Sequence, residues 1–292
     1  MPPINEPRPE MSPEEFRLLR ELVYEHCGIR FREDMKFMVE GRLWPRLEAA
    51  GVRDFSAYYR LLRLGVSRKE ELEAAVEAVS TKETYFFREP VQLRAFSDEV
   101  LPILRERNAH TRRLRLWSAG CSTGEEAYTL AMLVHESGLF TGWDVEVLGT
   151  DISKRVLGAA RAAEYGPGSF RATSADLKAR YFEPTSDPKV LRVREEIRAL
   201  VSFGHLNLMD ADASSLVARN DAIFCRNVMI YFDLAARKRV LRAFYDKLSE
   251  GGYLLLGHSE SLLNLSTDFE LVHLKEDLIY RRPTRGQQEP RS

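Results

Sequence analysis

Apolar residues in the first quarter of the chain recur at the spacing of amphipathic helices. Ser12–Glu15 begins this pattern with an N-cap serine, a proline in the first turn and a glutamate three residues after the serine, which together predict a helix start. The spacing predicts further helices at Asp34–Ala50, at Phe55–Leu64 and after a cap formed by Ser67–Glu70. Pro45 lies inside the second of these helices, where its missing N–H and its ring are expected to kink or split the helix.

The pattern changes from about Leu114, where short apolar runs begin to alternate with amphipathic helical stretches. The runs that predict strands are Leu114–Trp117, Val145–Gly149, Val201–Leu206, Ala222–Cys225 and Tyr253–Leu256. The intervening helices are expected at Ser122–Ser137, after Ser153 and at Asp233–Leu248. Because strands and helices alternate, this region is expected to form a doubly wound, mainly parallel α/β sheet with helices on both faces.

Two stretches depart from this alternation. Phe269–Leu274 and Asp277–Tyr280 predict two strands with almost nothing between them. So short a connection permits only a hairpin, and we therefore expect an antiparallel strand at one edge of the sheet. Tyr165–Leu200 is rich in glycine and proline and contains the alternating run Val190–Arg194, which predicts a small inserted β-rich subdomain.

These patterns divide the 292-residue chain into parts. We expect a helical N-terminal domain at 10–80, a linker and cofactor-covering segment at 81–113, and an α/β domain at 114–282 with an insertion near 165–200. The remaining residues, 283–292, are polar and are expected to be a disordered tail.

Composition narrows the possible partners. The formal net charge is -1, so no global field draws the protein toward nucleic acid or a membrane surface. Three widely spaced cysteines suggest a reducing, cytoplasmic setting rather than a disulfide framework. The six histidines show no metal-ligand spacing, so we expect no metal. No apolar run approaches the roughly 20 residues that span a bilayer.

The segment Trp117–Glu126 follows the first predicted strand and leads into a helix. Gly120 and Gly124 let the backbone approach a ligand closely. The pattern is not GxGxxG, and two acids at the helix start disfavour a diphosphate and favour a cation, such as the amino group of S-adenosylmethionine (SAM). The alternative is that four polar side chains only cap the helix: Ser122, Thr123, Glu125 and Glu126.

Later polar residues also follow predicted strands. Asp151 can accept hydrogen bonds from both ribose hydroxyls of a nucleoside, or else it caps the helix that begins near Ser153. Asn207 can bind the adenine edge and Asn227 the methionine tail, while Tyr231 is a candidate for the methyl-transfer channel. Taken singly, the asparagines are often only turn residues. Their shared place at the carboxyl ends of strands favours one binding site.

The aromatic segment, Lys82–Pro90, has three consecutive aromatic residues followed by Arg88. Such a segment can fold over a nucleoside and present Arg88 to an anionic substrate. The alternative for the aromatic residues is a hydrophobic latch between domains.

Together these motifs resemble the CheR family of chemotaxis receptor glutamate methyltransferases over nearly the whole chain. The most specific strings are ETYFFRE, WSAGCSTGEEAY, GTDIS, NLMD, FCRNVMIYFD and GGYLLLGHSES. The resemblance implies a helical N-terminal domain, a SAM-binding sheet domain and an inserted antiparallel β-subdomain. It implies SAM contacts at Thr84, Arg88, Glu126, Asp151, Asn207, Leu208, Arg226 and Asn227. Arg88 and Tyr231 resemble the catalytic residues nearest the transferred methyl group.

The resemblance also implies an activity and a partner. SAM would methylate glutamate side chains of the cytoplasmic helical domains of chemotaxis receptors, with S-adenosylhomocysteine as the product. A basic helix face formed by Lys36, Arg42 and Arg46 would dock on the receptor, unless that face is only a solvated surface. We expect a cytoplasmic monomer that neither binds nucleic acid nor inserts into the membrane. The rival interpretations are a non-catalytic SAM-binding signalling adaptor and a SAM methyltransferase with another substrate.

Overall fold

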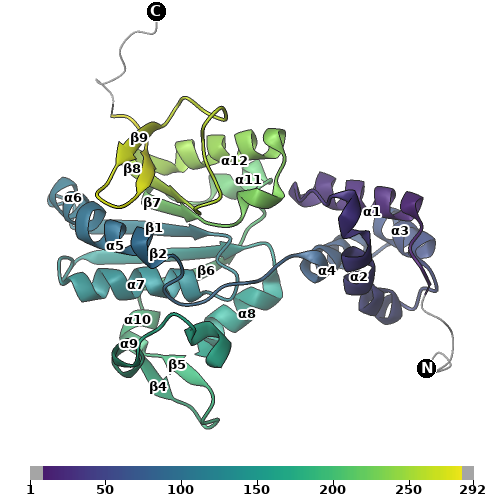
Figure 1. The fold of residues 1–292 in the computed structure, drawn as a ribbon, viewed down its shortest axis with the longest axis horizontal. Coiled ribbons are helices and arrows are strands. Elements are labelled where there is room, and N and C mark those ends of the chain that lie inside the picture. The colour runs from purple at the N-terminus through teal and green to yellow at the C-terminus, as the bar shows by residue number, and fades with distance from the viewer. Residues whose placement is uncertain (1–8, 285–292) are drawn as a thin grey trace, which may run out of the picture. The chain divides into compact units, whose positions relative to one another are not determined.

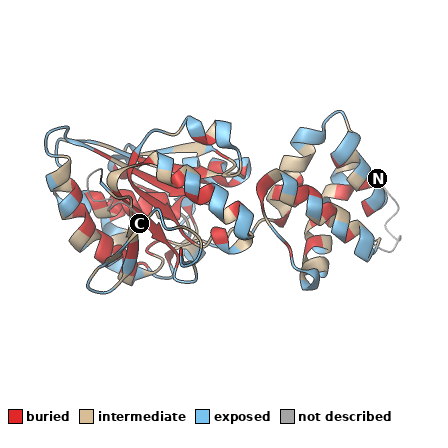
Figure 2. Cartoon of the chain, turned by 90° about the horizontal axis from the view of Figure 1, so that it is seen from above, coloured by how far each residue is buried: buried red, intermediate tan, exposed pale blue. Residues whose placement is uncertain are grey.

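A computed structural model describes residues 9–284, and the predicted tail lies outside them apart from its first two residues. The described chain divides into two compact units (Figure 1). One is helical and contains the residues up to Thr81 together with Tyr231–Ala236. The other contains Lys82–Ile230 and the residues from Arg237 onward. In each unit the buried residues gather on the inner faces of its helices and strands (Figure 2).

The helical unit contains the predicted N-terminal helices. They are α1 Pro13–Cys27, the 3-10 helix η1 Glu33–Met35, α2 Lys36–Ala50, α3 Phe55–Leu64 and α4 Arg68–Val79. The predicted capping box is confirmed, because the Ser12 hydroxyl accepts the Glu15 N–H and the Glu15 carboxylate accepts the Ser12 N–H. Buried side chains from each helix, such as Leu19, Leu47 and Tyr58, form the core of the unit.

Pro45 does not split α2, which runs without a break from Lys36 to Ala50. Proline removes one backbone hydrogen bond from a helix interior. Here Pro45 is on the exposed side of the helix, where water can satisfy the freed carbonyl, while Val39, Leu43 and Leu47 are buried on the opposite side. Burial of the apolar face therefore keeps the helix intact.

The segment Tyr231–Ala236, far along the chain, packs with the helical unit. The Arg30 N–H donates to the Tyr231 carbonyl at 2.9 Å, and Ile29 pairs with Phe232 in an isolated antiparallel bridge. The Tyr24 hydroxyl donates to the Asp233 carboxylate at 2.8 Å. The helical unit thus combines the N-terminal helices with a segment from much later in the sequence.

The second unit is built on a seven-stranded sheet of order β6-β2-β1-β7-β8-β10-β9. The strands are β1 Arg113–Ala119, β2 Asp144–Asp151, β6 Val201–His205, β7 Asn220–Cys225, β8 Leu248–Leu256, β9 Glu270–His273 and β10 Leu278–Arg281. Neighbouring strands from β6 to β8 are parallel. The predicted hairpin is confirmed: β9 at the edge pairs antiparallel with β10, which inserts between β9 and β8.

Helices cover this sheet on both faces, as the alternation predicts, and every residue of β7 is buried. The helices are α5 Pro90–Ala95, the π-helix η2 Phe96–Val100, α6 Leu101–Arg107, α7 Glu125–Ser137, α8 Lys154–Ala162, α11 Ala211–Ser215, the 3-10 helix η4 Met229–Tyr231 and α12 Leu234–Lys247. The end of η4 and the start of α12 belong to the helical unit. From β1 the chain builds outward through β2 to β6, and it then returns to place β7 on the other side of β1. The carboxyl ends of β1 and β7 therefore form the topological switch point, where ligands bind in such sheets.

The predicted β-rich insertion is confirmed as a three-stranded antiparallel sheet of order β3-β5-β4. Its elements are β3 Glu164–Tyr165, the 3-10 helix η3 Pro167–Phe170, α9 Ala175–Tyr181, β4 Phe182–Pro184, β5 Leu191–Val193 and α10 Glu195–Arg198. Val193, Tyr181 and Phe182 are buried, so this small sheet shares the hydrophobic core of the larger unit.

Candidate cofactor and active site

The loop between β1 and α7, residues 120–124, lies at the switch point and has an unusual backbone. Gly120 and Gly124 have φ angles of 87° and 93°, which residues with side chains rarely adopt. A Cβ atom at Gly120 would lie 2.4 Å from Val228, in the loop after β7. Glycine therefore lets the loops after β1 and β7 approach each other closely.

The polar side chains at the start of α7 do not cap that helix. Gly124 occupies the N-cap position, and no side-chain hydrogen bond caps the helix there. The Ser122 hydroxyl instead donates to the Lys82 carbonyl at 3.1 Å, and the Thr123 hydroxyl donates to the Glu125 carboxylate at 2.7 Å. The capping interpretation of this motif is therefore wrong.

Glu126 lies in the first turn of α7, and its carboxylate reaches β1 and the loop after β7. The carboxylate accepts a hydrogen bond from the Ser118 hydroxyl at 2.7 Å and lies 3.4 Å from the Arg226 guanidinium. Burial raises the pKa of Glu126 above its ordinary value, and the charge of Arg226 opposes this shift. Glu126 is thus a largely buried acid, with 15% of its side chain exposed, at the point where the sequence predicts a carboxylate facing a cation.

Asp151 ends β2 next to the same glycine loop. Its carboxylate accepts the backbone N–H groups of Ser122 and Ser153, both at 2.9 Å. Burial raises the pKa of Asp151, and the two amide hydrogen bonds oppose this shift. The Ser153 hydroxyl caps α8 by accepting the Val156 N–H, so the interpretation of Asp151 as the cap is wrong. Each carboxylate oxygen has a second lone pair that can accept a ligand hydroxyl.

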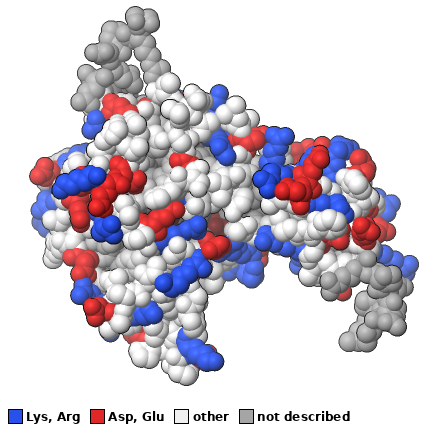
Figure 3. All heavy atoms as spheres, viewed as in Figure 1, with Lys and Arg blue, Asp and Glu red and all other residues white. Residues whose placement is uncertain are grey.

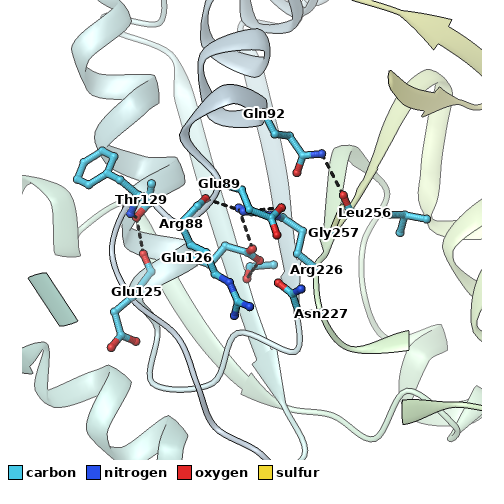
Figure 4. Close-up of polar contacts among 12 residues, drawn as sticks. Arg88, Glu89, Gln92, Glu125, Glu126, Thr129, Arg226, Asn227, Leu256 and Gly257 are labelled. Carbon is cyan, nitrogen blue, oxygen red and sulfur yellow. Dashed lines mark hydrogen bonds and ion pairs between the residues drawn. The ribbon is translucent and has the colours of Figure 1, made fainter. Parts of the chain in front are cut away.

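Arg226 is the centre of a buried ionic cluster just after β7 (Figure 4). Its guanidinium donates to the Arg88 carbonyl at 2.5 Å and lies 3.1 Å from the Glu89 carboxylate and 3.4 Å from that of Glu126. The Arg226 side chain is only 3% exposed. Two carboxylates therefore surround one buried cation, and their excess negative charge favours a positively charged ligand nearby.

Glu89, His258 and Glu260 also belong to the site, although the sequence patterns predict no role for them. Glu89 has a left-handed φ of 58°, and its carboxylate lies 3.3 Å from Nδ1 of His258. All three residues belong to the strings ETYFFRE and GGYLLLGHSES. Those strings are the signal that could have indicated them.

Glu260 shapes the loop that contains Asn227. Its carboxylate accepts four backbone N–H groups, at 2.8 Å from Asn227, 3.1 Å from Val228, 3.2 Å from Ile230 and 2.8 Å from Gly257. These bonds hold Asn227 in the left-handed region, at a φ of 59°. The Asn227 Oδ1 atom is buried and accepts no hydrogen bond from the described part of the chain. A buried acceptor without a partner is costly, so this atom indicates a ligand that donates to it.

The aromatic segment is bound to the sheet unit at several points. The Phe86 N–H donates to the Ser169 carbonyl at 2.9 Å, and the Phe87 N–H donates to the Thr129 hydroxyl at 3.2 Å. Phe86 is fully buried among three aromatic rings of the insertion, those of Tyr165, Phe170 and Phe182. Phe86 and Phe87 therefore anchor the segment to the sheet unit and its insertion, rather than forming a latch between the two units.

Arg88 follows these aromatic residues and is half-buried. Its backbone carbonyl is held by Arg226, and its guanidinium donates to the Glu83 carbonyl at 3.0 Å. Thr84 lies in the same segment and is also half-buried. The segment thus places a fixed arginine backbone beside the ionic cluster while the guanidinium lies at the surface.

Asn207 and Leu208 follow β6, whose residue His205 pairs with Asp151 in the register of the sheet. The Asn207 Oδ1 atom accepts the Met209 N–H at 3.0 Å, as expected of a turn residue. Both side chains are half-buried. The structure therefore brings Asn207, the predicted adenine-binding residue, and Leu208, a predicted SAM contact, to the same carboxyl edge as Asp151.

Two sets of predicted residues belong to the helical unit. Tyr231 is one of them, as the first residue of the segment that packs there. The other set is the predicted docking face on α2. Lys36 donates to the Met11 carbonyl at 2.6 Å, Arg42 donates to the Val79 carbonyl at 2.7 Å, and Arg46 pairs with the Glu71 carboxylate at 2.5 Å. All three cations on α2 are thus engaged inside the unit, and their docking role stays a prediction.

Within residues 9–284, no group of three or more histidine, cysteine, aspartate or glutamate side chains is arranged to hold a metal ion. No helix in the same range is long and apolar enough to cross a membrane. Over the face seen in Figure 3, basic and acidic side chains are interspersed rather than gathered into a stripe of one sign. This mixture agrees with the near-zero net charge.

The sheet order, the antiparallel β10 and the acid-lined turn after β1 define a class of protein, the SAM-dependent methyltransferases. The residues of the site fit a SAM molecule. The Asn227 Oδ1 atom is a buried acceptor without a partner among the described residues, and the ionic cluster has excess negative charge, so both suit a cationic ligand. The Asp151 carboxylate at the end of β2 suits the hydroxyls of a ribose. The chain belongs to the CheR methyltransferase family. Residues 82–278 match its SAM binding domain, and residues 14–80 match its all-alpha domain.

Curated relatives are similar over most of the chain. A chemotaxis protein methyltransferase of Borreliella burgdorferi is 36% identical over 256 residues, covering 86% of this chain and 89% of its own. Chemotaxis protein methyltransferase 1 of Pseudomonas aeruginosa is 35% identical over 274 residues, covering 91% and 97%. The Salmonella typhimurium chemotaxis protein methyltransferase is 36% identical over 269 residues, covering 89% and 88%. The protein is therefore a SAM-dependent protein methyltransferase.

Proposed function

We propose that the enzyme transfers a methyl group from SAM to glutamate side chains in the cytoplasmic helical domains of chemotaxis receptors. The products are glutamate methyl esters and S-adenosylhomocysteine. The observation that carries the proposal is the pairing of a cation-favouring ionic cluster with an arginine whose guanidinium lies at the surface beside it. The first feature suits SAM, and the second suits a carboxylate substrate. We expect the enzyme to act in the cytoplasm as a monomer, without nucleic acid.

The cofactor contacts follow from the chemistry of the site residues. Glu126 and the Asn227 Oδ1 atom would receive the ammonium group of the methionine tail. Asp151 would accept the ribose hydroxyls with its free lone pairs. The adenine ring would lie near Asn207 and Leu208. The family resemblance adds Thr84, Arg88 and Arg226 to these contacts.

The charge of the site favours the methyl donor over the demethylated product. SAM and S-adenosylhomocysteine share the ammonium group, and the sulfonium gives SAM one more positive charge than its product. Glu89 and Glu126 together exceed the charge of Arg226 by one negative charge when all three are ionised. In a buried site such a difference is weakly screened, so SAM should bind more tightly than its product.

The substrate carboxylate needs positioning rather than activation. When bound, SAM supplies an electrophilic methyl group on a sulfonium. A glutamate with a reference pKa of roughly 4.3 is already ionised near neutral pH, so no general base is required. Desolvating that carboxylate is costly unless a cation pairs with it. We assign this pairing to Arg88, which also orients the attacking oxygen, and we assign a supporting hydrogen bond to the Tyr231 hydroxyl.

Labelled SAM tests the proposal directly. The full-length enzyme, mixed with tritiated SAM and receptor cytoplasmic fragments, should transfer label to protein, and mild base should release it as volatile methanol, which marks an ester. Arg88→Ala should lower transfer at least about a hundredfold, a larger loss than any weakening of SAM binding can explain at saturating SAM. Label on nucleic acid, or SAM binding without transfer, would instead support the other-substrate or the adaptor interpretation.

A further inference from the structure

Two arginines from different parts of the sheet unit lie against one tyrosine ring. The guanidinium carbon of Arg171, just after η3 of the insertion, is 3.8 Å from the centre of the Tyr85 ring. The guanidinium carbon of Arg88 is 5.7 Å from the same centre. Arg171 is exposed and Tyr85 is half-buried. A second cation thus stands beside Arg88 at the surface of the aromatic segment.

Glu83 connects these two arginines. Its carboxylate pairs with Arg171 at 2.7 Å, and its backbone carbonyl accepts the hydrogen bond from Arg88 at 3.0 Å. The side chains of Arg171 and Glu83 are 48% and 64% exposed. Exposed ion pairs of this kind are weak because water screens them. A carboxylate arriving from solvent can therefore replace Glu83 on Arg171 at little cost.

Two neighbouring arginines, Arg88 and Arg171, suit a substrate helix with several acidic side chains better than a substrate with a single glutamate. If Arg88 pairs with the carboxylate that is methylated, Arg171 is the neighbouring cation that would meet the next acid. Side chains three or four residues apart on a helix are neighbours, with Cβ atoms about 5–6 Å from each other. The Tyr85 ring contacts both guanidinium groups, which limits the freedom that each loses on binding.

We propose that Arg171 selects substrates by binding a second carboxylate, three or four residues from the glutamate that is methylated. Glu83 occupies Arg171 until this substrate carboxylate replaces it. The inference rests on the proposed function, since it assumes a glutamate substrate at Arg88. It adds a residue of the insertion that determines specificity and a charge pattern that the substrate must have.

Two substitutions in the full-length enzyme distinguish substrate binding by Arg171 from a purely structural role of the Arg171–Glu83 pair. Arg171→Ala should raise the KM for a receptor fragment about twofold to fivefold, with kcat changed less than about twofold. Glu83→Gln should lower that KM about twofold to fivefold, because Arg171 is then free. If the pair only ties the insertion to the aromatic segment, both substitutions should raise the KM, and that result would overturn the proposal.

A matched control is available on the same sheet. Arg113 and Asp144 also pair at 2.7 Å, with side chains 51% and 61% exposed, but they lie at the amino-terminal ends of β1 and β2. Arg113→Ala should leave the KM unchanged. Replacing the receptor acids three or four residues from the methylated glutamate by glutamine should raise the KM of the wild-type enzyme and remove the effect of Arg171→Ala. If the wild type methylates receptor fragments but Arg171→Ala behaves identically, this inference alone fails; if the wild type transfers nothing, the proposed function fails.

Discussion

Burial raises the pKa of Glu126, while the charge of Arg226 lowers it, and the negative charge that remains on Glu126 should attract SAM. Glu126→Gln keeps the shape of the side chain but removes its negative charge. The variant should bind SAM about tenfold more weakly, while its affinity for S-adenosylhomocysteine should fall less, because only SAM has the extra positive charge. Titration calorimetry with both ligands measures the two affinities. Equal losses for both ligands would contradict the charge argument.

The same residue should make SAM binding depend on pH. Burial raises the pKa of Glu126, so the carboxyl takes up a proton as the pH falls through that raised value and loses the charge that attracts SAM. SAM affinity should therefore weaken toward acidic pH in the wild type and less in Glu126→Gln. Glu125→Gln is the matched control, because the Glu125 carboxylate is also buried but bonds to Thr123 and Ser169, outside the ionic cluster.

At the residue scale, the sequence predicts site residues that lie just after a strand, because the strand itself can be recognised from its apolar run. Glu126, Asp151 and Asn227 each follow an apolar run closely, and the structure brings them to one edge of the sheet. Glu260 could not be assigned in this way. It is 33 positions from Asn227, and only the folded chain brings its carboxylate to that loop. Tertiary contacts of this kind leave no periodic pattern in a sequence.

At the scale of elements, the contact between the aromatic segment and the insertion should control cofactor binding. Phe86 is fully buried, with its ring centre 4.8 Å from that of Tyr165 and 4.9 Å from that of Phe182. Phe86→Ala should lower stability by about 3–5 kcal/mol and also weaken binding of S-adenosylhomocysteine, because the segment loses its anchor. Thermal unfolding and calorimetry measure the two effects.

Phe140→Ala is the control for that variant. Phe140 is buried against Trp143 in the connection between α7 and β2, at the amino-terminal edge of the sheet. Phe140→Ala should lower the melting temperature about as much as Phe86→Ala does, without weakening the binding of S-adenosylhomocysteine. If both variants lose affinity equally, general destabilisation explains the loss and the anchoring role of Phe86 is wrong.

Element boundaries were predictable where propensity and burial agree, as at Phe55–Leu64, which is helical over that exact range of residues. They were less predictable where the backbone takes unusual angles. The helix expected from Ser122 begins only at Glu125, because Ser122 and Gly124 have positive φ angles. Apolar periodicity contains no information about such angles, and close approach of the loops after β1 and β7 imposes them.

At the scale of the whole molecule, the chain consists of two units with different tasks. The sheet unit contains the predicted cofactor contacts, and the helical unit contains Tyr231 and the predicted docking residues. The sequence pattern places residues 231–236 in the sheet region, because composition does not reveal that a short segment packs with a domain far away along the chain. Ligand binding should stabilise the sheet unit directly, which offers a way to measure the helical unit by itself.

Arg46 tests what the basic residues of α2 contribute. Arg46 pairs with Glu71 on α4, and the Tyr58 hydroxyl of α3 donates to the same carboxylate at 2.6 Å, so this contact joins three helices. Arg46→Ala should lower the unfolding free energy of the helical unit by about 1–3 kcal/mol, because it leaves a partly buried carboxylate without its cation. Thermal unfolding at saturating S-adenosylhomocysteine should show this loss. Arg63→Ala, which breaks an exposed pair with Glu25, should not. An unchanged unfolding curve with a raised KM for receptor fragments would instead establish the docking role.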